Sequence, residues 1–171
     1  MITIIDYEMG NLRSVAKAFE NLGFAARISA DPKDLRDTDK IVLPGVGAFR
    51  DCIQNLRQGG FVEPLLAHIE AGRPMLGICV GMQMLFDESE EFGLHQGLGL
   101  IPGRVVRFPD GMQEAGERLK VPHMGWNSIC IQGRRRSFRA LQTVAMFTLC
   151  IPITARPIIP SMSPPAAATA M

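Results

Sequence analysis

The chain has 171 residues, which fits one domain, and 47% of them are hydrophobic, which is enough to bury a core. Eighteen Lys and Arg against seventeen Asp and Glu give a net charge of +1, so nothing in the charge balance favours nucleic acid or a membrane surface as a partner. Asp6 and Glu8 come too early for a signal peptide, and no apolar run approaches the roughly 20 residues that span a bilayer, so we expect a soluble cytoplasmic protein.

Strands and helices alternate along the first 90 residues. The β-branched run at 2–7 predicts a strand, and apolar residues at helical spacing from Leu12 to Leu22 predict a helix that Gly23 ends. Further expected elements are strands at 24–29, 40–45 and 74–79 and helices at 61–72 and 80–89. Strands that are apolar throughout and alternate with helices indicate an α/β fold, with a mostly parallel sheet covered by helices on both faces.

Chemically suggestive residues lie at the carboxyl ends of three of these strands. Asp6 and Tyr7 end the first, residues 44–47 ("PGVG") lie at the end of the third, and Cys79 ends the fourth. In open α/β sheets the ligand site lies outside the carboxyl ends of the strands. The sequence therefore predicts a site at this edge of the sheet.

The composition changes after "PHMGWNSI", and no alternation of strand and helix is left. Prolines stand at 152, 157, 160, 164 and 165, which forbids a helix or an interior strand there. We expect an incomplete domain at 1–128 and an aberrant, poorly ordered tail at 129–171, so that the last third of the fold is missing or replaced.

Cys79 lies in "GICVG", between a predicted strand and a predicted helix. This is the form of a nucleophile elbow, a sharp turn that needs small neighbours such as Gly77 and Gly81. A helix starting at Val80 would favour the thiolate. The alternative is a buried cysteine packed as a small hydrophobe. The four cysteines, at 52, 79, 130 and 150, have neither metal-ligand nor disulfide-scaffold spacing, so no metal or cofactor is expected.

Three further stretches, "LPGVGAF" at 43–49, "CVGMQ" at 79–83 and "PHMGWN" at 122–127, resemble the class I glutamine amidotransferases. With the opening "IDYEMGNLRSV", they are more narrowly similar to the family of glutaminase subunits of imidazole glycerol phosphate synthase, which serves histidine biosynthesis. The resemblance covers residues 1 to about 128. It implies a flavodoxin-like domain that hydrolyses glutamine and passes the ammonia to a cyclase subunit, which makes imidazole glycerol phosphate and AICAR.

The resemblance also implies roles for individual residues. Cys79 would attack glutamine and form a γ-glutamyl thioester. Gln83, one helical turn further on, would contact the substrate, and Glu91 would bind its amino group. The oxyanion would be held by backbone amides of Gly45, Val46, Gly47 and Val80. The alternatives from the residues alone are an ordinary strand-to-helix turn at "PGVGAF" and a solvated Glu91.

In the family, "PHMGWN" lies at the face that docks on the cyclase, a (β/α)8 barrel, which would make a heterodimer. The residues of this chain that would form the interface are His123, Met124, Trp126 and Asn127. An interface tryptophan is a plausible anchor, and the alternative is that Trp126 fills the core of its own domain.

A thiol of ordinary pKa near 8.5 is only about 3% thiolate at neutral pH, so a cysteine nucleophile needs a base. The family uses a histidine oriented by a glutamate, in a segment of the form F-H-P-E. This chain has no such segment, and its histidines are His68, His95 and His123. His68 and His95 belong to no motif and are expected at the surface. We therefore expect a catalytically incomplete chain.

A shifted reading frame would explain the missing segment. Synonymous codons for residues 138–154 can be chosen so that reading two bases later gives F-Q-G-I-A-D-G-S and then D-V-Y-F-V-H-S-Y-Y, which resembles the family after "PHMGWN". The hypothesis is a frameshift near 129–134, and the alternative is a naturally divergent tail.

Two other functions stay open: a non-catalytic module that binds the cyclase, and a related cysteine hydrolase with a nucleophile elbow.

Overall fold

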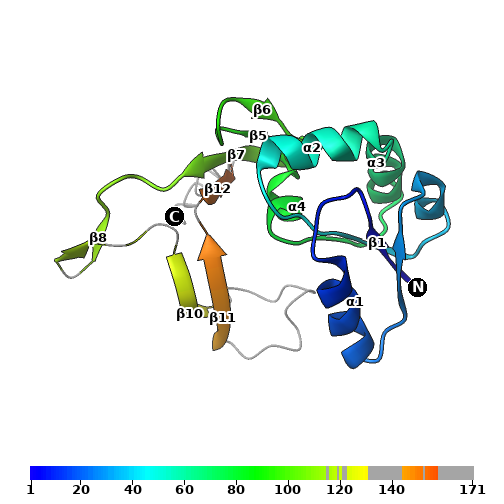
Figure 1. Cartoon of the computed structure of the whole chain (residues 1–171), viewed down its shortest axis with the longest axis horizontal. Helices are drawn as coiled ribbons and strands as arrows, with labels where there is room; N and C mark the ends of the chain where they lie inside the picture. Colours follow the sequence, from blue (N-terminus) through cyan, green and yellow to red (C-terminus); the bar gives the residue numbers. More distant parts are fainter. Residues whose placement is uncertain (115, 119, 121–122, 131–143, 152, 158–171) are drawn as a thin grey trace, which may run out of the picture. The chain divides into compact units, whose positions relative to one another are not determined.

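The computed structural model describes residues 1–114, 116–118, 120, 123–130, 144–151 and 153–157. The chain divides into two units (Figure 1). Unit 1 is Met1–Val105 together with the chain from Ala155, and unit 2 is Val106–Thr154. Unit 1 contains all of the residues predicted to carry the chemistry, from Gly45 to Glu91.

The main sheet of unit 1 is parallel and has the strand order β2-β1-β3-β4. Its strands are β1 (Ile2–Ile5), β2 (Ala26–Ser29), β3 (Lys40–Leu43) and β4 (Met75–Gly77). All four lie within the predicted strands. Because this strand order puts the ends of β1, β3 and β4 next to each other, the predicted convergence of Tyr7, the "PGVG" segment and Cys79 is confirmed.

Helices cover both faces of this sheet, as predicted (Figure 1). Side chains alternate along a strand, so Ile5, Ile41 and Leu43 face one layer while Ile4 and Val42 face the other. The first layer holds α2 (Phe49–Gln58) and α3 (Val62–Glu70), and the second holds α1 (Leu12–Asn21). A short 3-10 helix, η1 (Pro32–Leu35), adds the fully buried Leu35 to the first layer.

Local sequence accounts for the ends of the predicted helices. The side chain of Asn11 accepts a hydrogen bond from the Ser14 N–H at 3.3 Å and so caps the start of α1. Gly23 follows the end of α1 with φ +80°, and Gly72 follows the end of α3 with φ +70°. These are backbone conformations in which glycine has no steric penalty.

The sequence prediction was wrong in two places around these helices. It missed α2, and it expected one helix over 80–89, where the structure has a one-turn helix, α4 (Val80–Gln83), followed by strand β5 (Phe86–Ser89). The stretch with helical spacing at 80–89 is short, and strand pairing decides the structure of its second half. Strand β5 has a parallel partner, β7, on one side and an antiparallel partner, β6, on the other. Tertiary pairing overrides local helix propensity here.

The second sheet has the order β12-β7-β5-β6. Its other strands are β6 (His95–Gln96), β7 (Ile101–Arg107) and β12 (Ile153–Pro157). A strand at 153–157 differs from the expectation of a tail without regular structure. It is an edge strand with Pro157 as its last residue, a position at which the missing N–H of proline costs no ladder bond inside the sheet. Residues 158–171 of the predicted tail lie outside the described residues.

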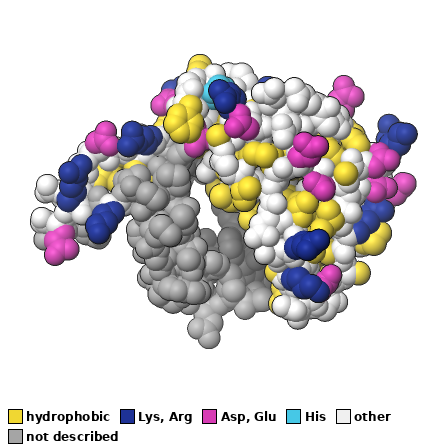
Figure 2. All heavy atoms as spheres, viewed as in Figure 1, with side chains coloured by type: hydrophobic (Ala, Val, Ile, Leu, Met, Phe, Trp, Pro, Cys, Tyr) yellow, Lys and Arg dark blue, Asp and Glu magenta, His cyan; other side chains and the backbone are white. Residues whose placement is uncertain are grey.

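Unit 2 contains two antiparallel pairs. One pairs β8 (Gln113–Glu114) with β9 (Glu117–Arg118), and the other pairs β10 (His123–Cys130) with β11 (Val144–Ile151). On the face shown in Figure 2, hydrophobic side chains of the described residues lie among acidic and basic ones. Within the described ranges, no helix has the length and apolarity needed to cross a membrane.

Candidate active site

Cys79 stands at a sharp turn between β4 and α4. Its backbone angles are φ 56° and ψ −121°, and the residue is exposed. A non-glycine residue in this conformation is strained by about 1–3 kcal/mol, and such strain persists only where the surroundings impose it. An exposed cysteine at a strained strand-to-helix turn is the geometry of a nucleophile elbow, as predicted. It is not the alternative, a buried cysteine packed as a hydrophobe.

Three glycines allow the chain to fold this tightly. A Cβ on Gly81 would lie 1.9 Å from the carbonyl oxygen of Leu43, and a Cβ on Gly77 would lie 2.7 Å from the Cα of Met82. A Cβ on Gly45 would lie 2.6 Å from the backbone N of Gly81. The end of β3 therefore lies directly against the first turn of α4, and a side chain at any of these glycines would push the two apart.

The segment 44–48, which we call the amide loop, approaches Cys79 at this contact. Among the residues that the structure describes, the backbone amides of Gly45, Val46, Gly47 and Val80 donate to no protein acceptor. Gly47 has φ +92°, which an L side chain would resist. Free amides beside a nucleophile suit an oxyanion-binding role, and that role stays a prediction.

Two buried side chains hold the amide loop from the core side. The Tyr7 hydroxyl donates to the Pro44 carbonyl at 2.6 Å, and the Cys52 thiol donates to the Val46 carbonyl at 3.2 Å. Tyr7 is 3% exposed and Cys52 is fully buried. The sequence analysis noted Tyr7 only by its place after a strand and missed Cys52, because α2 was not predicted.

Both of these groups stay protonated over a wide pH range. Burial, and then the neighbouring Cys52, raises the pKa of the Tyr7 phenol well above its ordinary value of 10.0. Burial also raises the pKa of the Cys52 thiol above its ordinary value of 9.0. Tyr7 and Cys52 are therefore neutral hydrogen-bond donors at neutral pH.

The two residues predicted to bind glutamine lie in α4 and just after β5. Gln83 is buried in α4, and its N–H donates to the Cys79 carbonyl at 3.1 Å. Glu91 follows β5, and its Oε2 accepts from the Phe49 N–H at 2.6 Å, at the start of α2. Glu91 is thus not simply a solvated residue, because its carboxylate caps the helix that leads out of the amide loop. Substrate binding by Gln83 and Glu91 stays a prediction.

No described histidine hydrogen-bonds to Cys79. His68 is 3% exposed in α3, so its predicted surface position was wrong. Its Nε2 lies 3.1 Å from the Pro74 carbonyl, and because a carbonyl only accepts, Nε2 carries the proton. His95 lies in β6 and is partly exposed.

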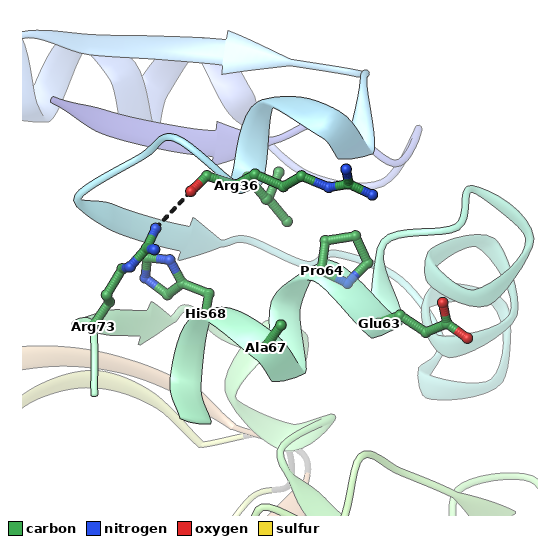
Figure 3. Close-up of a pocket in the computed structure, with 7 residues that line it drawn as sticks. Arg36, Glu63, Pro64, Ala67, His68 and Arg73 are labelled. Atoms are coloured by element: carbon green, nitrogen blue, oxygen red, sulfur yellow. Dashed lines mark hydrogen bonds between the residues drawn. The ribbon is translucent and has the colours of Figure 1, made fainter. Parts of the chain in front are cut away.

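A surface pocket of about 320 Å³ lies between η1 and α3, away from the amide loop (Figure 3). It is lined by Leu35, Arg36, Glu63, Pro64, Ala67, His68 and Arg73. The Arg73 guanidinium donates to the Arg36 carbonyl at 2.7 Å, which ties the two sides of the pocket together (Figure 3). Because none of the residues around Cys79 lines it, this pocket is not the predicted glutamine site.

The residues predicted to meet the cyclase fall in unit 2. His123, Met124, Trp126 and Asn127 belong to β10, where Trp126 pairs with Thr148 of β11. Their side chains lie outside the described part of the structure, so both the interface and the alternative of a core tryptophan stay untested. Over the residues that could be searched, no group of three or more His, Cys, Asp or Glu could hold a metal ion.

Comparison with known families decides the assignment. The family model "Glutamine amidotransferase class-I" matches residues 3–148. The chain belongs to this family. The resemblance seen in the sequence motifs ended at about residue 128, and the family match extends to residue 148. The match favours an amidotransferase over another cysteine hydrolase with a nucleophile elbow.

Several similar curated proteins are described as "Imidazole glycerol phosphate synthase subunit HisH". The one from Syntrophotalea carbinolica is 65% identical over 143 residues, which are 84% of this chain and 69% of the relative. The one from Geobacter metallireducens is 66% identical over 80% of this chain and 65% of the relative. This class-I amidotransferase chain therefore spans about two thirds of the length of the relatives it matches.

A solved structure described as "Crystal structure of glutamine amidotransferase" is similar in fold. The TM-score is 0.66 at 16% sequence identity, and the match covers 88% of this chain and 71% of that chain. At this identity the likeness supports the fold alone. It confirms the predicted α/β architecture of the glutamine amidotransferase type.

The contact between Gly81 and Leu43 generates a stability prediction. We expect Gly81→Ala to lower the free energy of unfolding by about 3 kcal/mol, because the new Cβ meets a backbone carbonyl that cannot move away cheaply. Gly72→Ala is the matched control: its Cβ enters open space, and only the positive φ opposes it, at about 1–2 kcal/mol. Urea unfolding of both variants measures the difference, and equal losses would contradict the steric explanation.

The raised pKa values of Tyr7 and Cys52 generate a pH prediction. Above pH 9 the unfolded chain loses these protons before the folded chain does, so the unfolded state binds fewer protons and the stability falls as pH rises. Each group contributes up to about 1.4 kcal/mol per pH unit within its window. Urea unfolding between pH 8 and 10.5 should show this fall. In the double variant Tyr7→Phe, Cys52→Ala the fall should be shallower, and an unchanged slope would count against buried neutral donors.

Proposed function

We propose that this chain is the glutamine-hydrolysing part of an imidazole glycerol phosphate synthase. The observation that carries the proposal is Cys79, exposed at a strained elbow beside a loop whose amides have no acceptor among the described residues. Support also comes from the family match and from relatives at 65% and 66% identity whose names specify this synthase.

The proposed reaction begins when the Cys79 sulfur attacks the side-chain carboxamide carbon of glutamine. An S–C bond forms, and the carbonyl electron pair moves to oxygen, where amides of the amide loop and of Val80 would stabilise the charge. Collapse of this intermediate breaks the C–N bond, and the nitrogen leaves as ammonia once it has gained a proton. Water then hydrolyses the γ-glutamyl thioester to glutamate. Glu91 and Gln83 would hold the amino and amide groups of the substrate.

The ammonia would pass to a cyclase subunit with a (β/α)8 barrel, in a cytoplasmic heterodimer. His123, Met124, Trp126 and Asn127 would face that partner. The support for this step is the word "subunit" in the names of the relatives, which describes a protein that works within a complex.

Turnover requires a base for the thiol and a proton for the departing ammonia, and among the hydrogen bonds of the described residues no histidine contacts Cys79. Its only histidines are His68, His95 and His123. In a comparable catalytic triad, losing the base alone removed a factor on the order of 10⁶ from turnover.

We attribute the missing base to a reading-frame shift near residues 129–134. Codons exist for residues 145–154 that spell D-V-Y-F-V-H-S-Y-Y when read two bases later, and Met146-Phe147 dictates the valine. The nucleotide sequence decides between this proposal and natural divergence. If the alternative frame does not continue to an F-H-P-E-type segment, there was no shift.

The first test is selective labelling of Cys79. A chloroketone analogue of glutamine, 2-amino-4-oxo-5-chloropentanoic acid, should alkylate Cys79 ahead of the other three cysteines, because the glutamine site concentrates it there. Iodoacetamide, which lacks the glutamine backbone, is the matched reagent for plain accessibility. Peptide mass spectrometry locates the label. Equal labelling of all accessible cysteines by both reagents would mean that no glutamine site is present.

The second test is glutaminase turnover. We expect no measurable release of glutamate from glutamine by the 171-residue chain, alone or mixed with a cyclase and its ligand. Restoring the family frame beyond Asn127 should recover turnover, and Cys79→Ala in the restored chain should abolish it. Size-exclusion chromatography of the same mixture reports docking. Cys79-dependent turnover by the chain as it stands would show that another residue serves as the base.

A further inference from the structure

The amide loop is fixed at two of its carbonyls, and these are two residues apart. Tyr7 donates to the Pro44 carbonyl at 2.6 Å, and Cys52 donates to the Val46 carbonyl at 3.2 Å. The donors come from different elements, since Tyr7 follows β1 and Cys52 lies in the first turn of α2. The Tyr7 hydroxyl also lies 3.0 Å from the position of a Cβ on Gly45, so the loop rests directly on this pair.

Fixing a carbonyl fixes the amide on the other side of the same peptide bond. In a trans peptide the C=O and the following N–H point in opposite directions. With the Pro44 and Val46 carbonyls turned toward the buried Tyr7 and Cys52, the N–H groups of Gly45 and Gly47 are turned away from the core. Gly45 rests on the start of α4, next to the exposed Cys79. The two amides therefore face the side of the loop from which a substrate would come.

Both donors must keep their protons for this arrangement to hold. Burial is the main cause that raises the pKa of each, and charge on Cys79 raises both further. A thiolate at Cys79 therefore strengthens the tendency of Tyr7 and Cys52 to stay neutral. We therefore expect Tyr7 and Cys52 to hold the amide loop also when Cys79 is a thiolate.

We propose that Cys52 is a positioning residue for the reaction at Cys79: by donating to the Val46 carbonyl, and alongside Tyr7, it holds the Gly47 amide toward the oxyanion of the intermediate. This inference rests on the proposed function, since it assigns a role to a buried thiol within that site. It gives Cys52 no contact with the substrate. It also differs from a packing role, because a packing role would not need a hydrogen-bond donor at this position.

The test separates the donor from the packing. Cys52→Ala removes the thiol, Cys52→Ser keeps a donor, and Ile53→Val is the matched control, since it deletes one buried carbon from the same helix. The readout is the rate at which Cys79 reacts with the glutamine chloroketone, divided by its rate with iodoacetamide. The thiolate displaces chloride or iodide in both reactions, and both reagents carry a carbonyl, but only the chloroketone has the glutamine backbone that would hold its carbonyl oxygen among the loop amides.

We expect Cys52→Ala to lower this ratio about 3- to 10-fold, the range that one hydrogen bond to a positioned carbonyl can supply. Cys52→Ser should stay within about twofold of the parent chain, as should Ile53→Val. An unchanged ratio in Cys52→Ala, or an equal loss in Cys52→Ser, overturns the proposal.

Amide hydrogen exchange of residues 45–49 gives a second readout that needs no ligand. Exchange in this segment should become faster in Cys52→Ala and should keep the parent rate in Cys52→Ser and Ile53→Val. If Cys79 of the parent chain does not react preferentially with the chloroketone, the chain has no working glutamine site and the proposed function is wrong. The hydrogen-exchange rates of residues 45–49 then test by themselves whether Cys52 holds the loop. Unchanged exchange in Cys52→Ala overturns the proposal in either case.

Discussion

The region around Cys79 depends on one steric constraint, the direct contact between the first turn of α4 and the end of β3. Gly81 sits where a Cβ would come within 1.9 Å of the Leu43 carbonyl, and Gly45 lies against the same turn from the other side. This contact stabilises the elbow conformation of Cys79, which a non-glycine residue would otherwise avoid. It also brings the amide loop to the nucleophile. The strained turn at Cys79 and the approach of the amide loop to it are therefore consequences of a single packing event between two neighbouring parallel strands.

Much of the main sheet could be predicted from the sequence, because each of its strands is short, apolar and bounded by a turn. The helices were less predictable. The segment Phe49–Gln58 has polar or charged residues at six of its ten positions, and this polarity hid a helical signal: Phe49, Cys52, Ile53 and Leu56 stand at helical spacing and meet one core. The segment 86–89 became a strand because two partners pair with it, and strand partners far along the chain leave no local signal.

The candidate site shows the same division between local and distant signals. Cys79, Gly77, Gly81 and the "PGVG" segment form recognisable motifs, since tight turns demand particular residue types at fixed spacing. The contacts that hold these motifs could not be predicted in the same way. The hydrogen bond from Tyr7 to Pro44 spans 37 residues, and the one from Phe49 to Glu91 spans 42. His68 was misplaced because a histidine near a helix end usually faces solvent, whereas this one donates inward to Pro74.

The hydrogen bond from the Phe49 N–H fixes one oxygen of the Glu91 carboxylate and leaves the other oxygen without this contact. Oε2 is occupied by the Phe49 N–H at the helix start, while the charge is shared over both oxygens. An ammonium group arriving at Glu91 would meet an anchored, oriented acceptor and would not have to order a free side chain, which lowers the entropy cost of binding. Glu91 comes just after β5, so the second sheet would fix the position of this negative charge relative to the site. Without the hydrogen bond from the Phe49 N–H, the Glu91 side chain would keep its charge but would sample more rotamers.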